Sequence, residues 1–61
     1  MNLQKKETLL IVDDSKFQRA IIKEMLGEHF RLEEATSGEE CLMILEKSSH
    51  LIDLVLLDLV M

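Results

Sequence analysis

The chain has 61 residues, of which 48% are hydrophobic and 31% are charged, and its formal net charge is −5. A chain of this size forms at most one small domain, and its composition excludes a disordered polymer. The acidic balance, with no cluster of Lys and Arg, argues against binding to nucleic acid, because neutralising phosphates requires cationic side chains.

The first predicted strand covers residues 8–12, Thr-Leu-Leu-Ile-Val. A run of branched apolar residues without polar alternation is typical of a parallel strand that is buried on both faces. Asp13 and Asp14 follow at once and end this strand. We expect residues 1–7, which precede it, to form a polar tail.

The first predicted helix begins at Ser15. Ser15 and Gln18 have the spacing of a capping box, in which the serine hydroxyl accepts a hydrogen bond from the backbone amide three residues later. Gly27 is a natural end for this helix. Apolar residues recur at helical spacing and predict one face that packs on the sheet. That face consists of Phe17, Ala20, Ile21, Ile22 and Met25.

Residues 30–35 alternate imperfectly between polar and apolar side chains, which predicts a second and more exposed strand. A turn leads into a second helix, for which Ser37 and Glu40 form another capping box. This helix should end at residues 48–50, and residues 51–57 predict a third strand. The last four residues of that strand are continuously apolar, so we expect it to be buried on both faces.

The order strand, helix, strand, helix, strand (βαβαβ) predicts an α/β fold with a three-stranded parallel sheet. The first and third strands are the most apolar and should be neighbours, whereas the half-polar second strand should lie at an edge. The spatial order is then 2-1-3. Right-handed crossovers in opposite directions place the two helices on opposite faces. Ligands of such sheets bind beyond the carboxyl ends of the strands, between strands 1 and 3.

Three aspartates follow the two strands that should be neighbours. Asp13 and Asp14 come after the first strand, and Asp58 closes the third. The carboxyl ends of parallel neighbours meet at one edge, so these carboxylates should converge and repel one another unless a cation is present. Mg2+ binds oxygen ligands of this kind and retains some water. With Mg2+ bound, a carboxylate oxygen could attack a phosphoryl group and form an aspartyl phosphate.

Three segments carry a family resemblance: "LLIVDDS", "EEATSGEECLMIL" and "IDLVLLDLVM". Together they resemble the first half of a receiver domain, the phosphoacceptor module of two-component response regulators. The resemblance covers residues 8–61 and rests on the combination of the double aspartate, its interval to Asp58 and the Asp-x-x-Met ending. It implies half of a flavodoxin-like fold, with residues 1–61 as the N-terminal part of one receiver domain.

The resemblance also implies roles for four residues. Asp58 would accept phosphate from the phosphohistidine of a sensor histidine kinase or a phosphotransfer protein. Asp14 would ligate Mg2+ directly, Asp13 would hold the ion through water, and the backbone carbonyl of Val60 would be a third protein ligand. Such a module relays a signal in a phosphorelay and is not itself an enzyme.

The family has five strands, whereas this chain supplies three. The Ser or Thr after the fourth strand and the Lys after the fifth, which contact the phosphoryl group in the family, are not among these 61 residues. We therefore expect this chain to be phosphorylated poorly and not to switch. Its apolar third strand should expose an edge that pairs with a second copy of the chain. A self-associating structural half-domain, such as a homodimer, is thus the alternative function.

Three further patterns bear on function and location. Aspartate-nucleophile phosphatases carry an Asp-x-Asp pair after an N-terminal strand, and the adjacent Asp13 and Asp14 do not fit that pattern. The single cysteine, Cys41, excludes an intrachain disulfide and fits a reducing cytoplasm. The longest apolar stretch, residues 51–61, is broken by two aspartates and is too short to cross a membrane.

Overall fold

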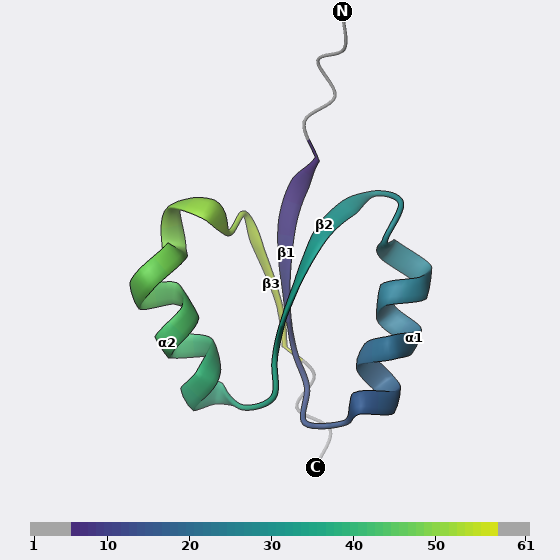
Figure 1. Ribbon diagram of the computed structural model, residues 1–61, viewed down its shortest axis with the longest axis horizontal. Coiled ribbons are helices and arrows are strands. Elements are labelled where there is room, and N and C mark those ends of the chain that lie inside the picture. The colour runs from purple at the N-terminus through teal and green to yellow at the C-terminus, as the bar shows by residue number, and fades with distance from the viewer. Residues whose placement is uncertain (1–5, 58–61) are drawn as a thin grey trace, which may run out of the picture.

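The computed structural model describes residues 6–57. Strands and helices alternate along the chain: β1 (Glu7–Val12), α1 (Lys16–Leu26), β2 (Phe30–Ala35), α2 (Gly38–Ser48), a 3-10 turn (Ser49–Leu51) and β3 (Leu54–Leu57). The three strands are parallel and have the order β2-β1-β3 (Figure 1). The predicted α/β class and strand order are therefore confirmed.

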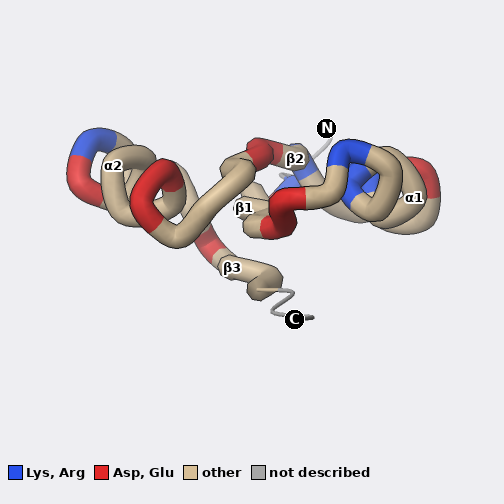
Figure 2. The backbone as a smooth tube through the Cα atoms, turned by 90° about the horizontal axis from the view of Figure 1, so that it is seen from below, with Lys and Arg blue, Asp and Glu red and all other residues tan. Residues whose placement is uncertain are grey.

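The central strand β1 fixes the register of both neighbours. It pairs with β2 from Glu7 opposite Phe30 to Val12 opposite Ala35. It pairs with β3 over a shorter length that ends with Val12 opposite Leu57. Strand β1 thus begins at Glu7, one residue before the predicted start. Helices α1 and α2 cover opposite faces of the sheet (Figures 1 and 2), as right-handed crossovers in opposite directions require.

The core lies mainly between the sheet and α2. Leu10 and Ile11 have no exposed surface, and successive side chains of a strand point to opposite faces. Leu10 therefore packs toward α2, whereas Ile11 points to the face that α1 covers. The cluster on the α2 side consists of Leu10, Val12, Ala35 and Cys41, with Ile44, Leu45 and Ile52 packed against it.

Helix α1 is rotated relative to the prediction. Phe17 and Met25 are 75% and 68% exposed, and no residue of the helix is buried. The half-buried positions of α1 are Arg19, Ile22 and Leu26, which share one helical face at spacings of three and four residues. The predicted apolar face was thus wrong except for Ile22. In this rotation two cations of α1 form ion pairs with β2, which are described below.

Both helices begin at the predicted serines. The Ser15 hydroxyl accepts a hydrogen bond from the Gln18 backbone amide at 3.2 Å. The Ser37 hydroxyl accepts the equivalent bond from the amide of Glu40 at 3.1 Å. The Glu40 carboxylate departs from the capping box, because it accepts from the backbone amide and the hydroxyl of Thr36. These two bonds lower the pKa of the Glu40 carboxyl and close the turn between β2 and α2.

Strand β3 is shorter and more exposed than predicted. It begins at Leu54, because Leu51 belongs to the 3-10 turn. Its four residues are between 38% and 54% exposed, so the expectation of burial on both faces was wrong for the part of the chain that the structure describes. Within residues 6–57, β3 pairs with β1 alone. The same residues include no helix long and apolar enough to cross a membrane.

Candidate functional site

The carboxyl edge of the sheet is where β1 and β3 lead into the predicted aspartates. Asp13 and Asp14 follow β1 directly. Asp58 and Val60, the other two predicted site residues, lie outside the described residues. The register nevertheless pairs Val12 with Leu57, and these are the residues that immediately precede Asp13 and Asp58 in the sequence.

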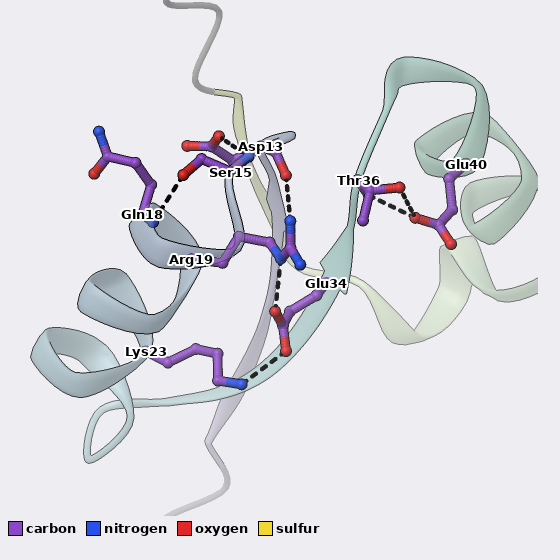
Figure 3. A network of polar contacts seen from close by, with 8 residues as sticks. All are labelled: Asp13, Ser15, Gln18, Arg19, Lys23, Glu34, Thr36 and Glu40. Carbon is purple, nitrogen blue, oxygen red and sulfur yellow. Dashed lines mark hydrogen bonds and ion pairs between the residues drawn. The ribbon is translucent and has the colours of Figure 1, made fainter.

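Asp13 is held through three of its polar groups. Its backbone amide donates to the carbonyl oxygen of Ala35 at 3.1 Å, which extends the pairing of β1 and β2 by one residue. Its own carbonyl oxygen accepts from the Arg19 guanidinium at 2.7 Å. Its carboxylate oxygen Oδ1 accepts from the Ser15 backbone amide at 2.8 Å. Figure 3 shows the bonds of Asp13 to Ser15 and Arg19 at the start of α1.

The second carboxylate oxygen of Asp13 is different. The residue is only 5% exposed, and its Oδ2 is buried and has no hydrogen-bond partner among residues 6–57. A buried polar atom that has no partner costs about 1–3 kcal/mol of stability, and such atoms in folded proteins call for an explanation such as an ion or a water. A cation at the edge of the sheet would supply that partner, so the residues present fit the Mg2+ that their family resemblance implies.

Asp14, in contrast, is exposed and next to this buried carboxylate in the chain. One buried and one accessible carboxylate are hard oxygen donors, which suit Mg2+ better than softer transition metals. Within residues 6–57 no three His, Cys, Asp or Glu side chains come together as a metal site. The third predicted carboxylate, Asp58, is not among those residues.

Arg19 is a site residue that the sequence-based prediction missed. Its Nε donates to a carboxylate oxygen of Glu34 on β2 at 2.8 Å, while Lys23 donates to the other oxygen at 2.9 Å. Hydrogen bonds from Lys23 and then from Arg19 hold the pKa of the Glu34 carboxyl below its ordinary value. The spacing of four residues between the two cations, with an acidic residue on the next strand, was the signal available in the sequence.

A hollow lies at the opposite edge of the sheet. It has a volume of about 420 Å³ and lies among the amino ends of the strands and the end of α2. Its walls mix the cations of Lys6 and Arg31 with the carboxylates of Glu7, Glu33 and Asp53. Two cations and three carboxylates line the hollow together, and one of the carboxylates, Asp53, already accepts from a backbone amide. A lining of mixed charge does not point to one ligand class.

Comparison with known proteins agrees with this geometry. The family model for the response regulator receiver domain matches residues 9–61. A "Probable cyclic di-GMP phosphodiesterase" of Vibrio cholerae serotype O1 is 46% identical over 54 residues, which is 88% of this chain and 12% of that relative. The chain thus spans about an eighth of the relative's length, and no solved structure gives a significant match. The chain belongs to the response regulator receiver domain family.

Proposed function

We propose that this chain is the phosphoacceptor segment of a two-component phosphorelay, and that Asp58 receives the phosphoryl group in a step that needs Mg2+. Membership of the receiver family supports a phosphoacceptor role in two-component signalling. The observation that supports the metal is the buried Oδ2 of Asp13 at the end of β1, which has no hydrogen-bond partner in the described segment 6–57. The strand that pairs with β1 there is the one that leads into Asp58.

Each residue has a separate role in this proposal. A carboxylate oxygen of Asp58 attacks the phosphorus of a phosphohistidine, the new O–P bond forms as the N–P bond breaks, and the imidazole nitrogen keeps the electron pair. Asp14 would bind the ion directly, Asp13 would hold it through water, and the backbone carbonyl of Val60 would be a third protein ligand. Bound Mg2+ would offset the negative charge of the transferring group.

The same proposal names the partners and the location. The phosphodonor is a sensor histidine kinase or a phosphotransfer protein, and the chain acts as a relay module and not as an enzyme with its own substrate. A cytoplasmic location belongs to the proposal, and the free thiol of the buried Cys41 supports it, since free cysteines are typical of reducing compartments. The expectation that these 61 residues do not switch on their own stays a prediction.

A metal titration tests the proposal. Mg2+ is added to the chain while backbone amide NMR signals are followed, and we expect saturable shifts at Asp13, Asp14 and Ser15. Asp58→Asn should weaken the binding, whereas Glu28→Gln, which makes the same chemical change at an exposed residue between α1 and β2, should not. Equal Mg2+ affinities of wild type and Asp58→Asn would contradict the proposal.

A phosphorylation assay adds an independent test. The chain is incubated with acetyl phosphate and Mg2+, and its intact mass is measured. We expect slow addition of a single phosphoryl group, which requires Mg2+ and is lost in Asp58→Asn. Phosphorylation that persists in Asp58→Asn would assign the acceptor to another residue. Efficient phosphorylation of the wild-type chain would contradict only the expectation that these 61 residues react poorly.

Exposed apolar residues favour self-association as a second candidate function. All four residues of β3 are at least 38% exposed, and Phe17 and Met25 of α1 expose more than half of their surface. Exposed apolar strands of this kind pair with other chains. Size-exclusion chromatography with light scattering should show a dimer that dissociates on dilution. Val55→Lys should weaken it, and a stable monomer at all concentrations would exclude this function.

A further inference from the structure

One guanidinium group joins three elements of the fold next to the candidate site. Arg19 lies on α1 and its side chain is 12% exposed. Its Nη1 donates to the carbonyl oxygen of Asp13 at 2.7 Å, and its Nε donates to Glu34 on β2 at 2.8 Å (Figure 3). Arg19 therefore ties the end of β1 to both the helix and the neighbouring strand.

The contact from Arg19 holds the backbone that carries the Asp13 carboxylate. The backbone amide of Asp13 is bonded to Ala35, its carbonyl oxygen to Arg19 and its Oδ1 to the amide of Ser15. These three bonds restrict the position of Oδ2, which is the Asp13 atom left without a partner among residues 6–57. Of the three contacts that fix Asp13, the one from Arg19 is the only one made by a side chain.

Lys23 provides a comparison within the same helix. It lies one turn beyond Arg19 and donates to the other oxygen of Glu34 at 2.9 Å. Both cations therefore neutralise the same carboxylate, but no hydrogen bond joins Lys23 to Asp13 among the described residues. The planar fork of arginine can serve two acceptors at once, which a lysine ammonium on a flexible stem does less well.

We propose that Arg19 is a positioning residue for the cation site, and that it sets the orientation of the Asp13 carboxylate while Glu34 holds its guanidinium in place. This inference rests on the proposed function, because it assigns Asp13 to a cation site. Groups that orient metal ligands in this way control the affinity of many metal sites, and their loss weakens binding by about 10- to 100-fold.

The direction in which Mg2+ affinity changes when Arg19 is replaced distinguishes a positioning role from a purely electrostatic one. The positive charge of Arg19 close to Asp13 repels a divalent cation, so removal of the charge alone would strengthen Mg2+ binding. Removal of a positioning contact weakens it instead. Arg19→Gln distinguishes the two, and Lys23→Gln is the matched control, because it removes the same charge and the other ion pair of Glu34.

The experiment measures the Mg2+ affinity of the 61-residue chain by NMR titration in wild type and in three variants. We expect Arg19→Gln to bind Mg2+ about 10-fold more weakly or worse. Arg19→Lys should remain weak, because it keeps the charge but loses the fork. Lys23→Gln should stay within about twofold of wild type, as exposed ion pairs contribute little. Tighter binding by Arg19→Gln, or equal changes in the two glutamine variants, would overturn the proposal.

Hydrogen exchange at the Ser15 amide provides a readout that needs no metal. This amide donates to Asp13 Oδ1, so its exchange should accelerate in Arg19→Gln and not in Lys23→Gln. If the wild-type chain shows no saturable Mg2+ binding, the metal in the proposed function fails. Faster Ser15 exchange confined to Arg19→Gln would then still support positioning of Asp13. Unchanged exchange in Arg19→Gln would refute it.

Discussion

Asp53 controls where β3 begins, and its substitution tests how the strand that leads to Asp58 is anchored. The carboxylate of Asp53 accepts a hydrogen bond from the backbone amide of Thr8 at 2.7 Å. Its own amide donates to the Thr8 carbonyl at 2.9 Å. These two bonds set the pairing that continues with Leu54 opposite Leu9. Asp53→Ala keeps the backbone bond and removes the acceptor of the Thr8 amide.

The expected loss of stability in Asp53→Ala follows from the burial of Thr8 and the exposure of Asp53. Thr8 is 9% exposed, and leaving a buried donor unsatisfied costs about 1–3 kcal/mol. Asp53 itself is exposed, so water can replace part of the lost bond and the lower part of that range applies. A chain of 61 residues has a free energy of unfolding of about 3–9 kcal/mol. The loss of stability in Asp53→Ala should therefore be large enough to measure and too small to abolish folding.

Urea unfolding followed by circular dichroism measures this loss. We expect Asp53→Ala to lower the free energy of unfolding by about 1–2 kcal/mol. Asp53→Asn should lose less, because its amide oxygen keeps an uncharged acceptor for Thr8. Glu46→Ala is the control, since it removes an exposed carboxylate of α2 and surface changes of this kind stay within about 0.5 kcal/mol. An Asp53→Ala variant as stable as wild type would refute the anchoring of β3 by this side chain.

Two further predictions concern the core and the charged network. Leu10→Ala should destabilise the chain by about 2–5 kcal/mol, because Leu10 is fully buried. Leu42→Ala should have little effect, because Leu42 is 63% exposed. Equal urea midpoints of the two variants would contradict the placement of the core. Because the fold lowers the pKa of the Glu34 carboxyl from its ordinary value of 4.5, ionised Glu34 stabilises the fold at pH values above 4.5. This contribution is lost as the pH falls through the folded-state pKa. The stability difference between wild type and Glu34→Gln should therefore shrink below about pH 4.5, and a difference that is independent of pH would argue against these ion pairs.

The strand order was predictable from the sequence because β1 is unusual in composition. Five consecutive residues, 8–12, include four that are strongly apolar, and a segment of this kind is stable only in the middle of a sheet with a helix on each face. Once the centre is assigned, the half-polar β2 must lie at an edge. The serine caps were equally predictable, since Ser15 and Ser37 need only the local backbone to form their bonds.

The rotation of α1 was not predictable from helical spacing alone. Its apolar residues nearly surround the helix, so two faces were available, one with Phe17 and Met25 and another with Ile22 and Leu26. In the fold, the second face lies toward the sheet, and the cations beside it pair with Glu34, which comes from another element. A pattern within one helix does not contain that information, and for the same reason the contact of Arg19 with Asp13 was missed.

The candidate site was predictable in its residues but not in its hydrogen bonds. The sequence places Asp13 and Asp14 at the end of β1, because a polar pair ends a buried strand. It does not reveal that Asp13 is buried while Asp14 is exposed. That difference arises from the bond of the Asp13 amide to the end of β2 and from the turn into α1, which only the folded arrangement brings together.

The buried oxygen of Asp13 also places a limit on how far this fold can be stabilised. A buried atom that has no partner within the described part of the chain, residues 6–57, reduces the stability of the fold by about 1–3 kcal/mol, and an apolar residue of similar size at this position would remove that loss. Screens for thermostable variants should therefore favour replacements of Asp13 that abolish cation binding. Such a conflict is a trade-off between stability and function, and in this small domain it is concentrated in a single carboxylate.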